Sequence, residues 1–452
     1  MKTLICNAQL VNEGTIRTQD LLIDNGRISQ IASQITAPAG AQVIDAQGKH
    51  LLPGMIDDQV HFREPGFPNK GTIASESRAA VAGGITSFME MPNVNPQTTN
   101  LQALEDKYTR ASQSSLANFA FYLGATNDNL EEIKRLDPNQ ACGVKIFMGA
   151  STGNMLVDNS ATLDGIFANS PVVIATHCED SPTIAANEAA MREKYGDAIP
   201  MELHGEIRSR EACLKSSQLA TELAIRHKAR LHVLHLTTAD ELYLFEPAKQ
   251  LAQLKGANIT AEVCVHHLSF NDSDYARLGS QIKCNPAIKT LADQQALIDA
   301  VNRDIIDIIA TDHAPHTWKR SKPTAISRRR PVCRWCNMHC SACWICMPRG
   351  TSVWKKSSKR PAMRWPSALN SKTGAICAKA IWRIWYWWIS TSLSRPRWKT
   401  PAITAVGRPL PATSLPPLSV VPGSMVTNCL TAVALSTIPW ANASHLVALN
   451  RT

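Results

Sequence analysis

The chain has 452 residues, 44% of them apolar and 19% charged, which is long enough for one large domain with a smaller companion. A formal net charge of +10 would ordinarily indicate a nucleic-acid or anionic-membrane partner. However, all 37 Asp and Glu lie in residues 1–318 with 26 of the 47 Lys and Arg, giving that part a charge of −11, and the other 21 give residues 319–452 a charge of +21. The basic charge belongs to one block, so we expect neither partner.

Residues 1–52 predict a small β-sandwich-like domain of short strands. The segments "TLICNAQLV", "DLLIDNGRISQI" and "AQVIDAQGKHLL" have strand character, and Asn25–Gly26 is typical of a hairpin turn. The opening residues lack the long apolar core and the small-residue cleavage site of a signal peptide, and no apolar run is long enough to span a bilayer. Together with six scattered Cys before residue 319, this predicts a cytoplasmic protein.

Residues 53–318 predict an α/β fold. Apolar strands such as "GMIDDQVHF", "CGVKIFMGA", "PVVIATHCED", "RLHVLHLTT" and "DIIDIIATDHAPH" alternate with helical stretches such as "SSQLATELAIRHKA". Repeated β/α units over this length favour a (β/α)8 barrel of the TIM type over an open sheet. In such a barrel, the residues just past each strand meet at one catalytic face.

Five of the predicted strand ends carry a metal-binding or ionisable side chain: His61, Lys145, His177, His235 and Asp312. Imidazoles with a carboxylate suit Zn2+ or a similar ion, which lowers the pKa of a bound water, and an Asp beside that water can move its proton. The pattern therefore predicts metal-assisted hydrolysis. A lone His near a strand more often has a structural role, and we assign that role to His232 and to His266 or His267.

Lys145 needs a chemical change before it can bind a metal, because an ammonium group has no lone pair. Its alternative role is an ion pair with a nearby carboxylate. Only conversion by CO2 to a carbamate would make it an anionic oxygen donor able to bridge two metal ions.

The chain resembles the dihydroorotase family of the amidohydrolase superfamily, particularly the longer bacterial type related to allantoinases and hydantoinases. The resemblance is carried by "PGMIDDQVHFREPG", "KGTIASESRAAVAGGITSFMEMPN", "GVKIFMGASTG", "THCED", "HVLHLTT", "KCNPAIK" and "TDHAPHTW", and it runs from residue 1 to Trp318. It implies reversible hydrolysis of dihydroorotate to N-carbamoyl-aspartate in pyrimidine biosynthesis, with a small-molecule substrate and one or two Zn2+ ions as cofactor. The oligomeric state stays open, with a homo-oligomer as one alternative.

The resemblance also implies roles for individual residues. The metal ligands would be His61, His177, His235, Asp312 and Lys145 as a carbamate, and Asp312 would also be the general base and acid. The substrate would be held by Arg63, whose planar fork of donors suits a carboxylate, and by Asn93, Asn285 and His316. Simpler roles stay open, since Arg63 can pair with Glu64 and Asn93 can cap a turn after Pro92.

Gln59 departs from the family's H-x-H pattern, in which a His stands two residues before His61. A Gln side chain offers only a neutral amide oxygen, which is a poorer zinc ligand than imidazole. Either the second metal is weak or absent, or Asp57 or Asp58 compensates. Two other functions therefore stay open: another cyclic amidase of the allantoinase or dihydropyrimidinase type, and a non-catalytic homologue that is an assembly partner of another pyrimidine enzyme.

Residues 319–452 have the composition of a frameshift product. They contain no Asp or Glu, and all 11 Trp lie at residue 318 or later, with seven of the 13 Cys. Rebuilding each codon from the third base of one residue and the first two bases of the next gives Glu from Trp318–Lys319, and the restored segments "LPLVQHAL" and "ADLVLVD" resemble the family's next two segments. We therefore expect no native fold in this tail, and we expect the β domain to lack its C-terminal strands.

The frameshift hypothesis also accounts for an apparent zinc motif. A C-x2-C pattern typical of structural zinc sites runs through Cys333, Cys336, His339, Cys340, Cys343 and Cys346. No hairpin or helix pattern flanks these residues, and the restored frame explains the same codons. We therefore expect no zinc site in the tail.

Resequencing the gene across the codons for Thr317 to Arg320 tests the hypothesis. One additional G would restore "TWEE" and return the acids and the C-terminal strands. An unchanged reading would leave a chain that keeps its site residues but folds poorly, because apolar surface stays uncovered. A soluble, monodisperse chain with the melting temperature of the G-restored protein would contradict this expectation.

Overall fold

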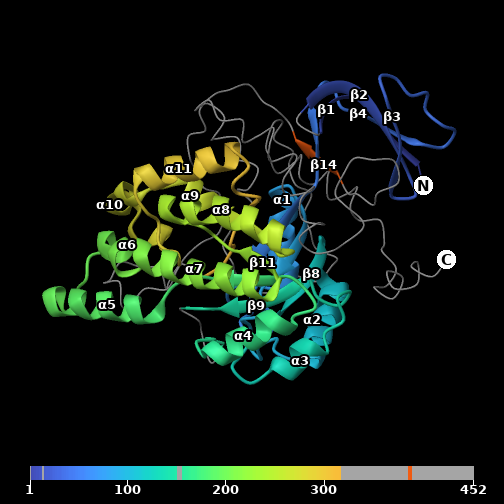
Figure 1. Cartoon of the computed structure of the whole chain (residues 1–452). Coiled ribbons are helices and arrows are strands. Elements are labelled where there is room, and N and C mark those ends of the chain that lie inside the picture. The colour runs from blue at the N-terminus through green and yellow to red at the C-terminus, as the bar shows by residue number, and fades with distance from the viewer. Residues whose placement is uncertain (1, 13–14, 150–154, 317–384, 389–452) are drawn as a thin grey trace.

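The computed structural model describes residues 2–12, 15–149, 155–316 and 385–388. Two sheets organise these residues: an eight-stranded parallel sheet with helices around it, and a six-stranded sheet that contains the N-terminal strands (Figure 1). No helix in these ranges is both long enough and apolar enough to cross a membrane.

The six-stranded sheet is built mainly from the first part of the chain. Its N-terminal strands are β1 (Lys2–Asn12), β2 (Thr15–Asp24), β3 (Arg27–Ala32), β4 (Gln42–Asp45) and β5 (His50–Pro53). The first three pair antiparallel, whereas β4 and β5 run parallel to β1. Asn25 and Gly26 join β2 to β3 with positive φ angles of 48° and 78°, which confirms the predicted hairpin turn. Ile5, Leu21 and Leu51 are buried in a small core on this sheet.

One further strand of this sheet comes from the proposed out-of-frame tail. The strand β14 (Trp385–Trp388) pairs antiparallel with β5, and Trp387 lies opposite Leu51. The expectation that the tail supplies no strand to this sheet is therefore wrong at these 4 residues. The physical reason is that β5 would otherwise be the edge of this sheet, and an edge strand can pair with an extended segment whichever frame encodes it. The rest of residues 319–452, including the Cys-rich segment, lies outside the described residues.

The eight parallel strands form the barrel that the sequence predicts. They are β6 (Met55–Val60), β7 (Ile85–Glu90), β8 (Asn118–Gly124), β9 (Gly143–Phe147), β10 (Ile174–His177), β11 (Arg230–Val233), β12 (Asn258–Cys264) and β13 (Ile308–Ala310). Neighbours in the chain are neighbours in the sheet, and a parallel bridge between Val60 and His313 closes the ring. The N–H of His61 also donates to the carbonyl oxygen of His313 at 2.8 Å.

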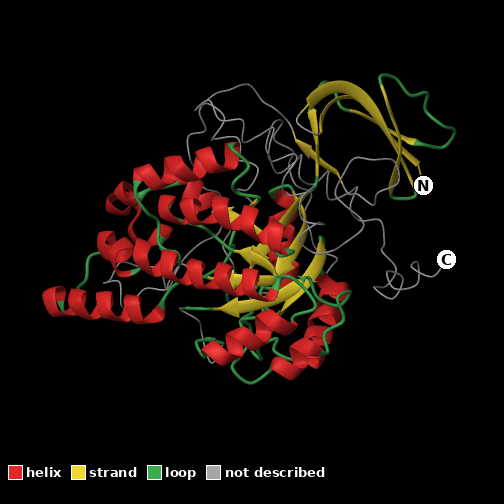
Figure 2. Ribbon diagram, in the orientation of Figure 1, coloured by secondary structure: helices red, strands yellow, loops and turns green. Residues whose placement is uncertain are grey.

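Helices follow the strands along the chain and lie outside them (Figure 2). They are α1 (Ile73–Ala82), α2 (Leu101–Ser114), α3 (Leu130–Lys134), α4 (Ser160–Asn169), α5 (Ser181–Tyr195), α6 (His204–Ile207), α7 (Arg210–His227), α8 (Ala239–Lys255), α9 (Val265–Ser269), α10 (Tyr275–Leu278) and α11 (Leu291–Asn302). The longer helices begin at side-chain caps: Thr72, Asn100, Asn159, Asp180, Ser209, Thr238 and Thr290. These side chains accept hydrogen bonds from N–H groups that the first helical turn leaves unpaired.

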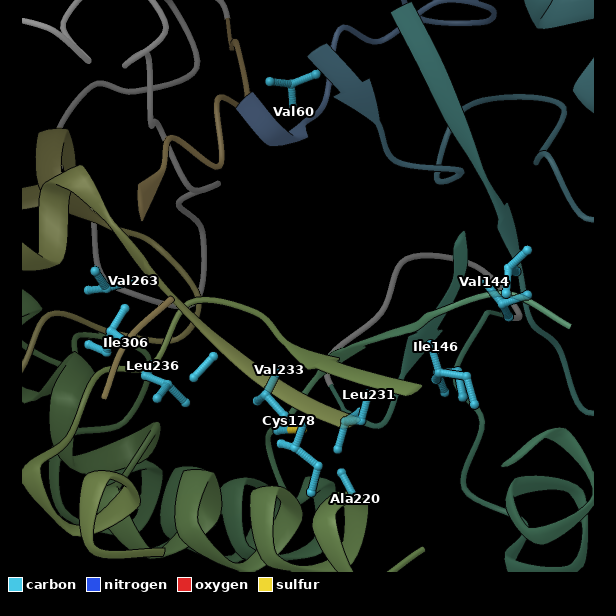
Figure 3. Close-up of a cluster of buried hydrophobic side chains, with 14 of the residues drawn as sticks. Val60, Val144, Ile146, Cys178, Ala220, Leu231, Val233, Leu236, Val263 and Ile306 are labelled. Atoms are coloured by element: carbon cyan, nitrogen blue, oxygen red, sulfur yellow. The ribbon is translucent and has the colours of Figure 1, made fainter. Parts of the chain in front are cut away.

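The largest apolar core lies between the strands and the helices. In Figure 3, Leu231 and Val233 of β11 point towards Ala220 of α7, and all three are buried. Because side chains alternate along a strand, His232 of β11 faces the interior of the barrel instead. The same alternation places Lys145 of β9 in the interior, between the outward-facing Val144 and Ile146.

A buried carboxylate reinforces the seam between the first and last barrel strands. Asp57 of β6 is fully buried and accepts a hydrogen bond from the Thr311 N–H at 3.2 Å and another from the Thr311 hydroxyl at 2.5 Å. Burial raises the pKa of Asp57 to about 7, although the Thr311 hydroxyl works in the opposite direction. These bonds fasten together two segments that are 254 residues apart in the chain.

We expect Thr311→Val to lower the free energy of unfolding by about 1–3 kcal/mol, because it leaves a buried carboxyl oxygen without its hydroxyl donor. Thr311→Ser keeps the hydroxyl and is the matched control. Urea denaturation of the two variants measures the difference. Equal stability of the Val and Ser variants would show that the hydroxyl does not hold the seam.

Candidate metal centre

His61 and Asp312 come from the two strands that close the barrel. His61 directly follows β6, and its Nε2 lies 3.0 Å from Oδ1 of Asp312, which follows β13 by two residues. The Nδ1 of His61 lies 2.7 Å from Oδ1 of Asn93. An amide oxygen only accepts, so the tautomer with its proton on Nδ1 satisfies Asn93 and leaves the Nε2 lone pair for a metal ion. Asn93 thus orients His61, a contact that the simple turn-capping role does not include.

The second pair of imidazoles lies at the ends of β10 and β11. His177 Nδ1 is 3.0 Å from His235 Nε2, and both side chains are buried. On its other side, His177 Nε2 lies 2.9 Å from Oε2 of Glu179. A carboxylate behind a ligating His is a common arrangement in metal sites, because it fixes the tautomer and the direction of the ring.

Burial keeps these imidazoles neutral. It lowers the pKa of His61, of His177 and of His235, in spite of opposing effects from Asp312 on His61 and from Glu179 on His177. A neutral imidazole has the lone pair that a metal needs, whereas imidazolium has none. For Asp312, burial alone would raise the pKa, but the hydrogen bond to His61 together with the charges of His61, His266 and Lys145 outweighs burial, and the carboxyl pKa falls below its usual range.

Lys145 of β9 is buried to 1% exposure in the barrel interior, and its Nζ lies 4.6 Å from the ring centroid of Phe147. Burial lowers the pKa of Lys145 to about 7, although the charges of Asp312 and Glu262 oppose the shift. A substantial fraction of this amine is therefore neutral at neutral pH. Only the neutral amine has the lone pair that reacts with CO2, so the environment suits a carbamate.

The two predicted substrate residues Arg63 and His316 lie together at the closing seam. The Arg63 guanidinium is 3.3 Å from His316 Nε2, and its Nε donates to the carbonyl oxygen of Pro315 at 3.4 Å. The alternative partner, Glu64, instead accepts a hydrogen bond from the Ile73 N–H at the start of α1. The third of these predicted substrate residues, Asn285, has its Oδ1 3.2 Å from Nε2 of His204.

Three of the site residues have backbone conformations that L-residues rarely adopt. The φ angles of Arg63, His235 and Asp312 are 75°, 38° and 47°. Non-glycine residues with positive φ concentrate at functional sites, where the surrounding fold imposes the strain. At His235 the source of support is visible, because its N–H donates to Oε1 of the buried Glu262 at 3.1 Å.

Two charged residues outside the predicted site support His177. Glu179 stands two residues after it in "THCED", and Arg208 forms an ion pair with the same Glu179 carboxylate. Burial alone would raise the pKa of Glu179, but the Arg208 charge and His177 together lower it to about 2. The position of Glu179, two residues after His177, could have predicted its contact with that His. No local sequence pattern marks Arg208.

His232 lies in a buried cluster of acidic side chains in the barrel interior, and its structural role stays a prediction. Its Nε2 lies 3.1 Å from Oδ2 of Asp58 and 3.3 Å from Oε2 of Glu262, and all three side chains are buried in the barrel interior. Burial lowers the pKa of His232, but the two carboxylates outweigh it and raise the pKa to about 9. The two acidic neighbours therefore favour the protonated form of His232, while burial raises the pKa of Glu262 to about 8.

The donor set at the carboxyl ends of the strands fits a divalent metal of the zinc type. It offers neutral imidazoles, an ionised carboxylate and a lysine amine in a buried region, and the facing nitrogens of His177 and His235 converge as two ligands of one ion would. Of the two acids that could compensate for Gln59, Asp57 accepts hydrogen bonds from Thr311, and Asp58 lies in a buried group with His232 and Glu262 whose ligand atoms are within 4.8 Å of one another.

Comparison with known proteins places these residues in a family. The family model described as dihydro-orotase-like matches residues 48–220. The dihydroorotase of Carboxydothermus hydrogenoformans is 35% identical over 315 residues, covering 69% of this chain and 70% of that protein. The dihydroorotase of Methanosarcina acetivorans is 33% identical over 319 residues, covering 69% and 67%. Both alignments are about as long as the segment before residue 319.

Solved structures show the same fold. The L-hydantoinase (dihydropyrimidinase) of Arthrobacter aurescens superposes with a TM-score of 0.79 at 23% identity, covering 85% of this chain and 86% of that one. At this identity the likeness concerns the fold alone. Taken with the sequence relatives, these findings establish that the chain belongs to the dihydroorotase family.

Proposed function

We propose that the chain is a metal-dependent cyclic amide hydrolase that converts dihydroorotate reversibly to N-carbamoyl-aspartate in pyrimidine biosynthesis, in the cytoplasm. The observation that carries the proposal is the pairing of His61 with Asp312 at the seam of the barrel, beside Arg63 and His316. The pair of His61 and Asp312 suits hydrolysis, and Arg63 with His316 suits a substrate that bears a carboxylate. The relatives named dihydroorotase support the same reaction.

The metal would be Zn2+, as one or two ions, held by His61, His177, His235, Asp312 and Lys145 in its carbamate form. When bound, it supplies Lewis acidity, which lowers the pKa of water and polarises a carbonyl oxygen. The ligand positions are supported by the convergence of the imidazole nitrogens, and the carbamate is supported by the lowered pKa of Lys145.

Asp312 would move the proton. Its carboxyl is ionised at neutral pH, since its pKa lies below its usual range, and it can therefore accept a proton from the attacking water. Passing that proton to the ring nitrogen would complete the opening of the amide. The hydrogen bond between His61 and Asn93 keeps the imidazole in a fixed orientation beside this carboxylate throughout.

Arg63 would bind the substrate carboxylate. The guanidinium is positioned by the Pro315 carbonyl and by His316, and a planar fork of donors suits a carboxylate better than it suits a neutral ring. This favours dihydroorotate over the uncharged rings of other cyclic amidase substrates. Asn285 and His316 would complete the contacts to the substrate.

Turnover of three substrates by the full chain tests the proposal. We expect hydrolysis of dihydroorotate and little of dihydrouracil or allantoin, and we expect loss of turnover after removal of metal by a chelator, with recovery on adding Zn2+. Turnover of a neutral ring alone would favour another cyclic amidase. Full metal content without turnover on any of the three would favour the non-catalytic homologue.

The role of Arg63 can be tested separately. We expect Arg63→Gln to raise KM for dihydroorotate by roughly tenfold to a hundredfold, because it removes a charge-assisted hydrogen bond worth about 1.5–3 kcal/mol. Arg78→Gln on the exposed face of α1 is the matched control and should leave KM unchanged. Steady-state kinetics at fixed metal content give both values, and an unchanged KM for Arg63→Gln would refute the assignment.

A further inference from the structure

Gln59 faces a thiol in the barrel interior. The Gln59 side chain is 2% exposed, and its Oε1 accepts a hydrogen bond from Cys264 Sγ at 3.8 Å. Cys264 is the last residue of β12, so it reaches the same end of the barrel as His61 and Asp312. Gln59, which replaces the first imidazole, therefore contacts Cys264, a side chain that can bind a metal as thiolate.

Two further donors follow directly in the chain. Cys264 and the two histidines of α9, His266 and His267, are buried, and one potential ligand atom from each lies within 4.8 Å of those of the other two. Thiolate and imidazole are the preferred protein ligands of zinc. The cluster therefore has the chemistry of a metal site, and the order Cys-x-His-His on one short segment brings its donors together without help from other strands.

The two histidines differ in their surroundings. His267 Nε2 lies 3.2 Å from the carbonyl oxygen of Pro286, so it is committed to the loop that contains Asn285. His266 stands two residues past Cys264, which pairs with Ala310 in the parallel ladder of β12 and β13. Asp312 likewise stands two residues past Ala310, so Cys264 and His266 follow the strand next to the one that Asp312 follows, at the same end of the barrel.

We propose that Cys264 and His266, at the end of the seventh barrel strand, supply the metal donors that Gln59 does not, and so complete a zinc-type site beside His61 and Asp312. This inference rests on the proposed function, because it concerns the metal of that same site. On binding, the Sγ–H bond of Cys264 breaks, the proton passes to solvent, and the sulfur binds the ion without any change in oxidation state.

Cobalt substitution of the full chain tests this directly. A thiolate ligand gives Co2+ an intense near-ultraviolet charge-transfer band, which oxygen and nitrogen ligands do not give. We expect the band in the unaltered chain and its loss in Cys264→Ser, together with at least about tenfold weaker metal binding. We expect His266→Asn to keep the band but to weaken binding similarly. Cys142→Ser removes a buried thiol at the other end of a barrel strand and should change neither.

A second variant distinguishes loss of a metal ligand from misfolding of the chain. Gln59→His restores an imidazole at the first strand, and in the Cys264→Ser background it should recover metal occupancy, measured by plasma mass spectrometry, without recovering the band. Failure of Gln59→His to recover occupancy, while both chains keep the circular dichroism of the unaltered protein, would overturn the idea that one residue replaces the other. Unchanged occupancy and band in Cys264→Ser would overturn the ligand assignment.

The two proposals fail in different ways. A full chain that binds no metal and hydrolyses no dihydroorotate would refute the proposed function itself. A full chain that binds metal and turns over dihydroorotate, but whose Cys264→Ser variant keeps its metal and shows no loss of the cobalt band, would refute only the further inference.

Discussion

Closure of the barrel between β6 and β13 is the constraint on which the site depends. The backbone bridge from Val60 to His313 and the buried bonds from Asp57 to Thr311 hold the first and last strands side by side. His61 follows one strand and Asp312 follows the other, so the seam sets their separation. A change at the seam would therefore alter both the stability of the barrel and the distance between His61 and Asp312, because the same few residues determine both.

Burial in the barrel determines which of the site groups carry charge. It leaves the strand-end imidazoles neutral and lowers the pKa of Lys145 to about 7, which prepares these groups to bind a metal or to react with CO2. In the barrel interior, His232 lies between Asp58 and Glu262, and burial raises the pKa of Glu262 to about 8. Glu262 also supports the strained backbone of His235, so this inner cluster is connected to the site.

Gln59 shows how the structure limits the alternatives that a motif leaves open. The sequence offered Asp57 and Asp58 as substitutes for the missing imidazole, since they are the nearest acids along β6. The structure commits both to other partners and brings Cys264 to Gln59 from a strand 205 residues away. Nothing local in "AEVCVHH" marks this contact, because the side chains of β12 and β6 meet only when the barrel closes.

The sequence by itself determined the order of strands and helices, the hairpin at Asn25–Gly26 and the placement of the candidate ligands at strand ends, because periodicity and turn chemistry are local properties. Motif spacing also determined the family. Only the tertiary structure decided that Asn93 orients His61, that Arg208 supports Glu179, and that residues of the tail add a strand to the N-terminal sheet. These contacts join distant segments, and a partner that arrives from another strand or helix leaves no pattern in the sequence beside it.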